Sequence, residues 1–497
     1  MTRVLVAPFP TDHNLLVNFE ILSSPVCFLQ SIVPNIPDWL RQLESWWEQE
    51  GQGISDATDR ASTPWLRMFD LSGARVDEIL YAPEYWKMLR HGYASGMIWR
   101  VFEENSIYSA GLGIYVTSFY DPGLACPYTV SLGTAVPLSK YSDDTLKQRF
   151  LSKMLQKGES AWQGATWMTE IKGGSDLGAN IETIAYRHHD RWLLTGDKYF
   201  SSNAAAELAV VAARPKGAPK GVRGLALYLV PRLREDGNLN YFIRRLKNKI
   251  ATRSVPTGEI ELRDSEAWLL GQPEQGIYLI LEVLNISRVA NSLGSIALAQ
   301  RALADALSFA QSRIIFGKPL IEQPLMRHQF EERLQQLRAA AKLARQSLKL
   351  LNETWQQKPP YSERYHLFRL VTHLAKYWTA ELAVQTAKWA MEVHGGLATL
   401  QEFRAERWLR EAMILAIWEG PAHRQILDGL EVIERKRADR LLFQMLSPAV
   451  NPSALHAMED RIEHYLRLPQ EQKEAGAESL FSELANFTAT ALDASTK

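Results

Sequence analysis

The chain has 497 residues, of which 46% are hydrophobic and 23% charged, so a largely disordered chain is excluded and about three domains are expected. Lys and Arg together number 56, as do Asp and Glu, and this zero net charge argues neither for nor against a nucleic-acid partner. The only cysteines, Cys27 and Cys126, exclude a disulfide framework and a cysteine-based zinc site. Because no apolar run reaches 18 residues and no signal peptide is recognisable, we expect a cytoplasmic protein without a membrane segment.

Residues 1–160 are predicted to form a helical N-terminal domain. Tryptophans and leucines recur three and four positions apart, as they do on one face of a helix. Breaks in the helices are predicted at Pro122 and Pro127. The alternation typical of a strand is not found before about Gly164.

Residues 161–270 are predicted to form a small β domain, an antiparallel barrel or sandwich. Short apolar segments follow one another here, separated by clusters of Pro and Gly. Strands do not alternate with helices, so a doubly wound sheet is not expected. The predicted strands are Gly164–Thr169, Arg191–Lys198, Leu208–Ala213, Leu225–Val230 and Glu259–Leu262.

Residues 271–440 are predicted to form a four-helix bundle, because long stretches with helical spacing contain few breaks. Residues 441–497 are predicted to be a polar tail with helical character, and its four basic and eight acidic side chains make it negative. The expected fold is therefore α+β and mostly α. The first bundle helix is expected to begin near Gly276, and the other three are expected at Glu331–Trp355, Tyr365–Val393 and Leu409–Glu434.

Two motifs in the β domain are suited to holding a flat polar ligand. Met168–Leu177 follows a predicted strand and combines hydroxyls with glycines, so its backbone N–H groups can approach a ring carbonyl or a phosphate. Lys198–Asn203 ends the next predicted strand and sets an aromatic side chain beside two serines. The alternatives are an ordinary turn for the first motif and core packing for the second.

Three further motifs lie in the helical bundle. Arg313–Leu320 closes a long helix, and helix capping explains its glycine but not Arg313 and Phe316 together. Glu392–Gly396 is ordinary glycine capping when taken alone. In Ile417–His423 a carboxylate follows an apolar run; such surroundings raise the pKa of a carboxyl group, which suits a general base. The alternative is a glutamate that begins the next helical turn.

These five motifs, in this order, resemble the acyl-CoA dehydrogenase family of flavoproteins, and the resemblance extends from about Asp70 to Glu434. Within the family, the sequence is most similar to the AidB-like, alkylation-response branch. The finer likeness is carried by Met168–Asp176, Arg245–Lys249, Arg253-Ser254, Trp268–Gly271, Pro319–Ile321, Gln323–His328 and Ala390–Val393.

The resemblance implies an FAD-binding homotetramer or dimer with an N-terminal helical domain, a middle β domain and a C-terminal four-helix bundle. Glu419 falls on the catalytic base of the family, and Arg288 and Ser175 fall on the substrate side. Arg313 and Phe316, with Glu392, Gly395 and Gly396, would reach the FAD of a neighbouring subunit. The other residues that would contact the cofactor are Met168, Thr169, Gly174, Ser175, Phe200, Ser201, Ser202, Trp418, Gly420 and His423.

The sequence departs from the family pattern near both the cofactor and the substrate. Pro421 stands where the family commonly has Thr or Ser, His423 where it has Gln or Asn, and Ala251 where it has Gly. Glu392 replaces the usual Gln. Leu284–Ser287 lacks the aromatic–Asp pair found in many members.

The first functional hypothesis is an FAD-dependent dehydrogenase that oxidises the thioester of an acyl group with CoA or a carrier protein. Its electrons would pass to an electron-transfer flavoprotein or to oxygen. Residues 214–263 hold twelve basic and four acidic side chains, an excess that suits phosphate groups or a solvated surface. The alternatives are an AidB-like protein associated with DNA protection, against which the acidic tail argues, and a flavoprotein without dehydrogenase activity.

Overall fold

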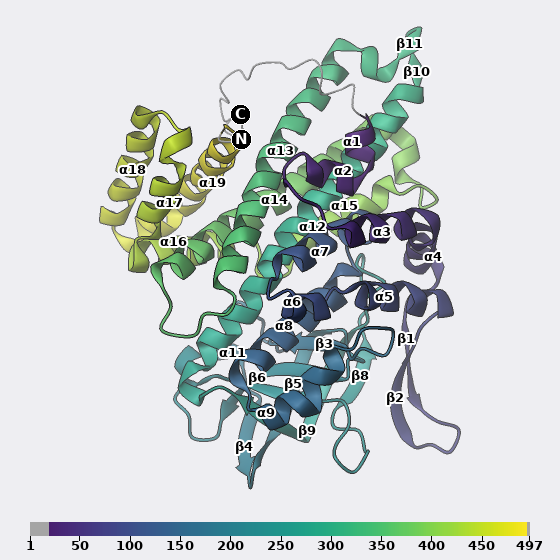
Figure 1. Ribbon diagram of the computed structural model, residues 1–497, viewed down its shortest axis with the longest axis vertical. Helices are drawn as coiled ribbons and strands as arrows, with labels where there is room; N and C mark the ends of the chain where they lie inside the picture. The colour runs from purple at the N-terminus through teal and green to yellow at the C-terminus, as the bar shows by residue number, and fades with distance from the viewer. Residues whose placement is uncertain (1–18, 495–497) are drawn as a thin grey trace.

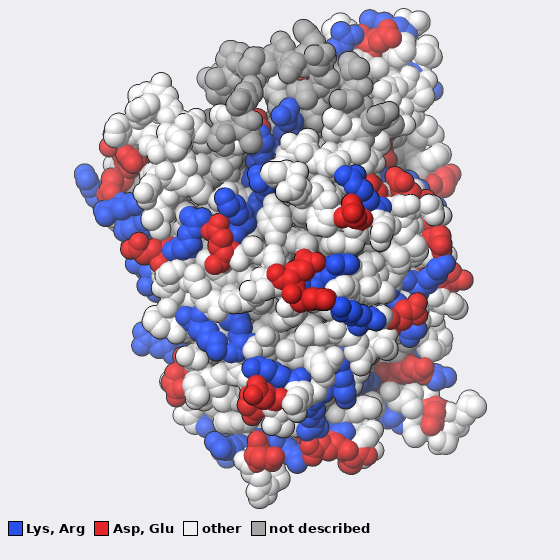
Figure 2. All heavy atoms as spheres, in the orientation of Figure 1, with Lys and Arg blue, Asp and Glu red and all other residues white. Residues whose placement is uncertain are grey.

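The computed structural model describes residues 19–494 and places a β domain beneath a stack of long helices (Figure 1). The fold is mostly helical with one small β domain, as the sequence predicts. In the described part of the chain, no helix combines the length and the apolarity needed to cross a membrane. Positive and negative side chains are interspersed over the visible face (Figure 2), in keeping with the zero net charge.

The N-terminal part is helical around an apolar core but also contains a hairpin of strands. Strands β1 (Trp65–Phe69) and β2 (Arg75–Leu80) pair antiparallel, so the expectation of no strand before Gly164 is wrong. The side chains of β1 are exposed or half-buried in alternation, and the segment therefore lacks the buried stripe that marks a strand in sequence. The helices are α1 (Phe19–Ser23), α2 (Pro25–Gln30), α3 (Asp38–Trp46), α4 (Gln52–Ala61), α5 (Pro83–Ser95), α6 (Trp99–Glu103), α7 (Tyr108–Tyr120), α8 (Ala125–Tyr141), α9 (Asp144–Leu146) and α10 (Ser152–Met154).

The two predicted proline breaks have different outcomes. Pro122 lies between α7 and α8, as predicted. Pro127 lies in the first turn of α8 and does not break it, because the N–H groups of a first turn have no acceptor within the helix. Both helices are almost entirely buried, and α7 packs against the long helix α12 (Gly276–Ser312).

The β domain is a closed barrel. Its strands pair in the cycle β6–β4–β5–β9–β7–β6, with β3 added to β6 and β8 added to β9. The prediction of a purely antiparallel sheet is wrong, since β6 pairs parallel to both β3 and β4. Two of the strands, β4 and β8, were not predicted, because they carry few buried side chains. The strands are β3 (Gly164–Trp167), β4 (Ile184–His188), β5 (Arg191–Ser202), β6 (Leu208–Pro215), β7 (Ala226–Pro231), β8 (Phe242–Leu246) and β9 (Thr257–Leu270).

The helical bundle differs from the prediction at its fourth helix. The expected helix Leu409–Glu434 is two helices, α15 (Ala405–Ile417) and α16 (Ala422–Lys436), separated by a turn. In that turn Glu419 and Gly420 have positive φ angles of 60° and 97°, and Pro421 precedes the first residue of α16. The three preceding helices are α12 (Gly276–Ser312), α13 (Pro324–Thr354) and α14 (Glu363–His394); a small hairpin, β10 (Ile314–Ile315) with β11 (Lys318–Pro319), follows α12.

The C-terminal segment is helical, as predicted, but it is not merely a polar tail. It forms α17 (Ala438–Leu446), α18 (Pro452–Arg467) and α19 (Gln470–Ala494), and α19 packs against α13, α14 and α16. Phe481 is fully buried against Gly429 of α16, where an added side chain would lie only 2.4 Å from its ring. Helix α16, which follows the turn at Glu419, is thus supported from outside by α19.

Candidate active site

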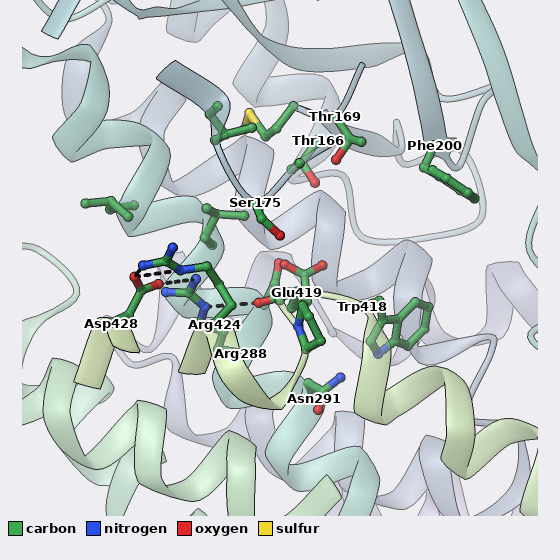
Figure 3. A pocket seen from close by; sticks show the side chains of 18 of the residues that line it. Thr166, Thr169, Ser175, Phe200, Arg288, Asn291, Trp418, Glu419, Arg424 and Asp428 are labelled. Carbon is green, nitrogen blue, oxygen red and sulfur yellow. Dashed lines mark hydrogen bonds and ion pairs between the residues drawn. The ribbon is translucent and has the colours of Figure 1, made fainter. Parts of the chain in front are cut away.

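A cavity of about 1880 Å³ lies where the β domain, the N-terminal helices and the helical bundle meet. Thr169 and Ser175 enter it from the β-domain side, and Glu419 and Trp418 enter from the opposite side (Figure 3). The volume exceeds the range of about 300–1000 Å³ typical of a site for one small ligand. Of the predicted site residues, the cavity is lined by Met168, Thr169, Gly174, Ser175, Phe200, Ser202, Arg288, Trp418, Glu419 and Gly420.

The loop from Met168 to Asp176 is fixed to the barrel by Glu170. The Glu170 carboxylate accepts from Lys198 Nζ at 2.6 Å, from Thr183 Oγ1 at 2.6 Å and from the Glu182 N–H at 2.6 Å. Burial raises the pKa of Glu170, but the Lys198 ammonium and these hydrogen bonds outweigh burial and lower it overall. The loop is thereby held with its hydroxyls toward the cavity.

Glycine is required where the loop turns beside Thr169. A Cβ atom at Gly174 would lie 2.5 Å from Thr169 Oγ1, which is closer than such contacts occur. Gly173 has a φ of +114°, a conformation that residues with a side chain rarely adopt. Asp176 then caps the one-turn helix α11 (Leu177–Asn180) by accepting from the Ala179 N–H at 3.0 Å.

Aromatic rings and hydroxyls share one wall of the cavity. Phe200 and Ser202 face the cavity from the end of β5, whereas Ser201 between them is fully buried on the other face of the strand. Ser201 does not line the cavity, and its buried Oγ has no hydrogen-bond partner among the described residues. Trp418 lines the cavity too, and its buried Nε1 has no hydrogen-bond partner among the described residues.

Glu419 is held through its main chain. Gln425 Nε2 donates to the Glu419 carbonyl at 2.9 Å, and Arg288 Nε donates to the same oxygen at 3.2 Å. The side chain of Glu419 is thereby left free to face the cavity. Burial raises the pKa of the Glu419 carboxyl, while the charges of Arg288 and Lys376 oppose that rise.

Arg288 belongs to a buried charge network rather than standing free at the substrate side. Its guanidinium donates to Asn285 Oδ1 at 3.1 Å and to Asp428 Oδ2 at 3.3 Å. Asp428 also accepts from Arg424 Nε at 2.9 Å. Burial lowers the pKa of Arg288, with Asp428 and Glu419 opposing the shift. The network joins α12 to α16 across the turn that carries the candidate base.

The residues present fit a flavin. The Phe200 and Trp418 rings offer flat surfaces for a ring system, and Thr169 and Ser202 offer hydroxyls to its polar edge. The unpartnered Trp418 Nε1 is a buried donor that a ligand acceptor would satisfy. The cavity also leaves room for a second ligand beside Glu419.

Besides Ser201, six predicted cofactor residues do not line this cavity. Arg313 and the strongly exposed Phe316 lie beyond the end of α12, and Glu392, Gly395 and Gly396 lie at the end of α14. These two helix ends meet, since the Phe309 and His394 rings are 4.7 Å apart. His423 is exposed in the first turn of α16. Within one chain these residues are not brought to Glu419.

Sequence reasoning missed the residues that fix the turn at Glu419. Gln425 and Lys376 are both buried, and each donates to the Gly420 carbonyl, at 2.9 and 2.8 Å. The available signal was Lys376 itself, a charged residue of α14 that stands between Leu374-Ala375 and Tyr377-Trp378. Cys126 and Lys249 also line the cavity and were not predicted as site residues.

The basic excess of residues 214–263 is largely used within the β domain. Arg244 pairs with Asp197 and Glu261, Arg245 and Lys247 pair with Glu259, and Arg263 pairs with Glu261. The side chains of Arg214, Arg232 and Arg234 donate to backbone carbonyls. These contacts account for seven of the twelve basic side chains, and Arg223, Arg245, Lys247 and Lys249 also line the cavity.

Three family models match the chain in consecutive segments. The AidB N-terminal domain matches residues 40–158, the acyl-CoA dehydrogenase middle domain matches residues 165–265, and the acyl-CoA dehydrogenase C-terminal domain matches residues 274–433. The chain is 30% identical to the putative acyl-CoA dehydrogenase AidB of Escherichia coli over 78% of its own length and 71% of that protein. It is 29% identical to acyl-CoA dehydrogenase family member 11 of Caenorhabditis elegans over 76% of its length, and spans 64% of that protein.

Solved structures share the fold over nearly the whole chain. Bd2924 in its apo form is 26% identical with a TM-score of 0.83, and the match covers 98% of both chains. Caenorhabditis elegans ACDH-11 in complex with C11-CoA is 24% identical with a TM-score of 0.80, and the match covers 99% of this chain and 89% of that one. The chain belongs to the acyl-CoA dehydrogenase family, a family of FAD-dependent oxidoreductases that act on CH–CH groups.

Proposed function

We propose that the protein oxidises an acyl thioester to its α,β-unsaturated form, with Glu419 as the base. The observation that carries the proposal is the Glu419 carboxyl facing a large cavity opposite Thr169 and Ser175, on a turn held by Arg288 and Gln425. The thiol part of the substrate is that of CoA or of a carrier protein. The electrons pass on to an electron-transfer flavoprotein or to oxygen.

The work of Glu419 is to take the proton from the carbon next to the thioester carbonyl. It must be ionised to accept this proton at a carboxylate oxygen, and the nearby charges of Arg288 and Lys376 favour the ionised form. Bound FAD supplies the acceptor for the hydride that leaves the next carbon, so the substrate loses two electrons and two hydrogens. The half-buried position of Glu419 limits the access of water to its carboxylate.

In this proposal the cofactor lies against Met168, Thr169, Gly174, Ser175, Phe200, Ser202, Trp418 and Gly420. Arg313, Phe316, Glu392, Gly395 and Gly396 act across an interface, on the FAD of a second copy of the chain. Support comes from exposed apolar side chains around this end of the bundle, which a second copy would cover. Besides Phe316 these are Ile314, Leu325, Leu397, Leu400 and Phe403.

The test uses Glu419→Gln, which keeps the shape of the side chain and removes its basicity. The purified wild type is expected to be yellow and to bleach anaerobically with at least one member of an acyl-CoA panel. Glu419→Gln should keep the flavin spectrum and lose bleaching by at least about a thousandfold, within the range that general-base catalysis contributes. Glu332→Gln, an exposed position on α13, is the matched control and should bleach like the wild type.

Two results would contradict the proposal. Full bleaching by Glu419→Gln would remove Glu419 as the base. A yellow wild type that no CoA or carrier-protein thioester bleaches would favour a flavoprotein without dehydrogenase activity, the alternative motivated by Pro421.

A further inference from the structure

Lys376 is a buried lysine in the middle of α14, directly behind the turn that carries Glu419. Its side chain is 1% exposed, and among the described residues it forms no ion pair. Its Nζ instead donates to two backbone carbonyls, Ala416 O at 3.1 Å and Gly420 O at 2.8 Å. A lysine is rarely buried without an acidic partner, because removing its charge from water is costly.

The two carbonyls lie on either side of Glu419. Ala416 belongs to the last turn of α15, where backbone carbonyls find no N–H donor within the helix. Gly420 is separated from the first residue of α16 by Pro421 alone. Between them the chain reverses through the positive φ of Glu419, a conformation that is unfavourable for residues other than glycine. One ammonium group thus joins the two ends of the strained turn.

Lys376 also acts on Glu419 through its charge. Burial lowers the pKa of Lys376 to about 7, the charge of Glu419 opposes that shift, and Arg288 adds to it. Two further titratable groups interact with this pair. Glu381 on α14 interacts electrostatically with Lys376, and Cys126 of α8 does so with Glu419.

We propose that Lys376 is a positioning residue that holds the Glu419 turn by its two carbonyls and keeps the Glu419 carboxyl ionised for catalysis. The inference rests on the proposed role of Glu419 as the base. It adds that the base depends on a cation from α14 as well as on Arg288 of α12. The two cations approach the turn from different helices, α14 and α12.

The test compares Lys376→Met and Lys376→Arg with Lys349→Met, a change at an exposed lysine of α13. Met keeps the length of the side chain without its charge, and Arg keeps the charge. Without the Lys376 charge, the acidic limb of the pH profile of kcat/KM for thioester oxidation should move to higher pH. At a fixed pH below the limb, kcat/KM then falls about tenfold for each pH unit by which the limb moves. Lys376→Arg and Lys349→Met should leave the limb in place.

A second measurement does not need a substrate. The carboxyl band of Glu419, taken as the infrared difference between each protein and its Glu419→Gln counterpart, should titrate at higher pH in Lys376→Met than in the wild type. An unshifted band and limb, with activity reduced equally at all pH values, would leave Lys376 a purely structural role and overturn the proposal. If the wild type oxidises no thioester while the band shifts as expected, the proposed reaction fails and the link between Lys376 and Glu419 stands. If Lys376→Met does not fold, Lys376→Gln takes its place: a limb at higher pH than in the wild type supports the proposal, and an unchanged limb contradicts it.

Discussion

Gln425 holds Glu419 by its carbonyl and not by its carboxyl. The Gln425 amide donates to both Glu419 O and Gly420 O at 2.9 Å, while its oxygen lies 2.9 Å from Nδ1 of the fully buried His373. Burial lowers the pKa of His373 to about 3, so the ring is neutral at physiological pH. The neutral His373 thus orients the amide group that fixes the turn at the candidate base.

Replacing Gln425 with Glu should therefore impair catalysis without emptying the cofactor site. The carboxylate cannot donate to the two carbonyls, which keep only their hydrogen bonds from Arg288 and Lys376, and its own charge is buried beside them. We expect the rate of thioester-dependent flavin reduction to fall at least about tenfold and the flavin content to stay near that of the wild type. Gln470→Glu, at the exposed start of α19, serves as the control. Equal rates for the two variants would show that the amide is dispensable.

Substituting Gly174 with Ala should weaken FAD binding. The new methyl group would lie 2.5 Å from Thr169 Oγ1 and displace a hydroxyl that faces the cavity. We expect the Kd for FAD, measured by fluorescence titration of the apoprotein, to rise about tenfold or more, while the melting temperature of the apoprotein changes little. Gly53→Ala is the matched control, because nothing lies within 4 Å of a Cβ at that position in α4. Unchanged FAD affinity would place the cofactor away from this loop.

Glu411 should make the stability of the protein depend on pH. Burial raises the pKa of Glu411 to about 7; Arg407 opposes the shift, and Asp121 and Asp59 add to it. A carboxyl whose pKa is higher in the folded than in the unfolded state stabilises the fold in its protonated form. This contribution is complete at pH values below the ordinary pKa of the carboxyl and is lost as the pH rises through about 7. Its loss amounts to at most about 3 kcal/mol.

The substitution Glu411→Gln removes this titration. The glutamine keeps a side-chain oxygen that accepts a hydrogen bond from the Thr252 N–H, as the Glu411 carboxylate does at 2.9 Å. Urea titrations give the free energy of unfolding of the wild type and of Glu411→Gln. The wild-type value minus the value of the variant should be larger near pH 5 than near pH 8. The exposed Glu332→Gln should give a difference that does not vary with pH. A constant difference for Glu411→Gln would mean that the carboxyl has an ordinary pKa in the folded protein.

The order of helices, β domain and bundle could be predicted from the sequence because long buried helices and strands repeat their apolar spacing along their whole length. The turn at Glu419 was missed because apolar spacing continues from α15 into α16, although the dipeptide Gly420-Pro421 is typical of a turn. Strands β4 and β8 were missed for the opposite reason: they bury few side chains and are held by pairing with neighbouring strands.

The candidate site was predictable only where chemistry is local in the sequence. Glu419 stands beside an apolar run, and Thr169 and Ser175 belong to one short glycine-containing loop. The supports of Glu419 come from α12, α14 and α16 and meet only in the folded bundle. Arg288 was placed at the substrate side by resemblance, and its engagement with Asp428 depends on tertiary packing that spacing does not reveal.

Phe316 should control both assembly and cofactor binding. Its side chain is 95% exposed at the tip of the β10–β11 hairpin, where an aromatic ring in water has no structural use within one chain. Phe316→Asp is expected to convert the assembled protein to monomers in sedimentation velocity and to lower its FAD content in parallel. Leu71→Asp, at the equally exposed turn of the β1–β2 hairpin, should do neither. If Phe316→Asp stays assembled and fully loaded, the hairpin is not part of the interface. If it becomes monomeric but keeps its FAD, each chain holds its cofactor alone, and the roles inferred for Arg313, Glu392 and Gly395 across an interface are wrong.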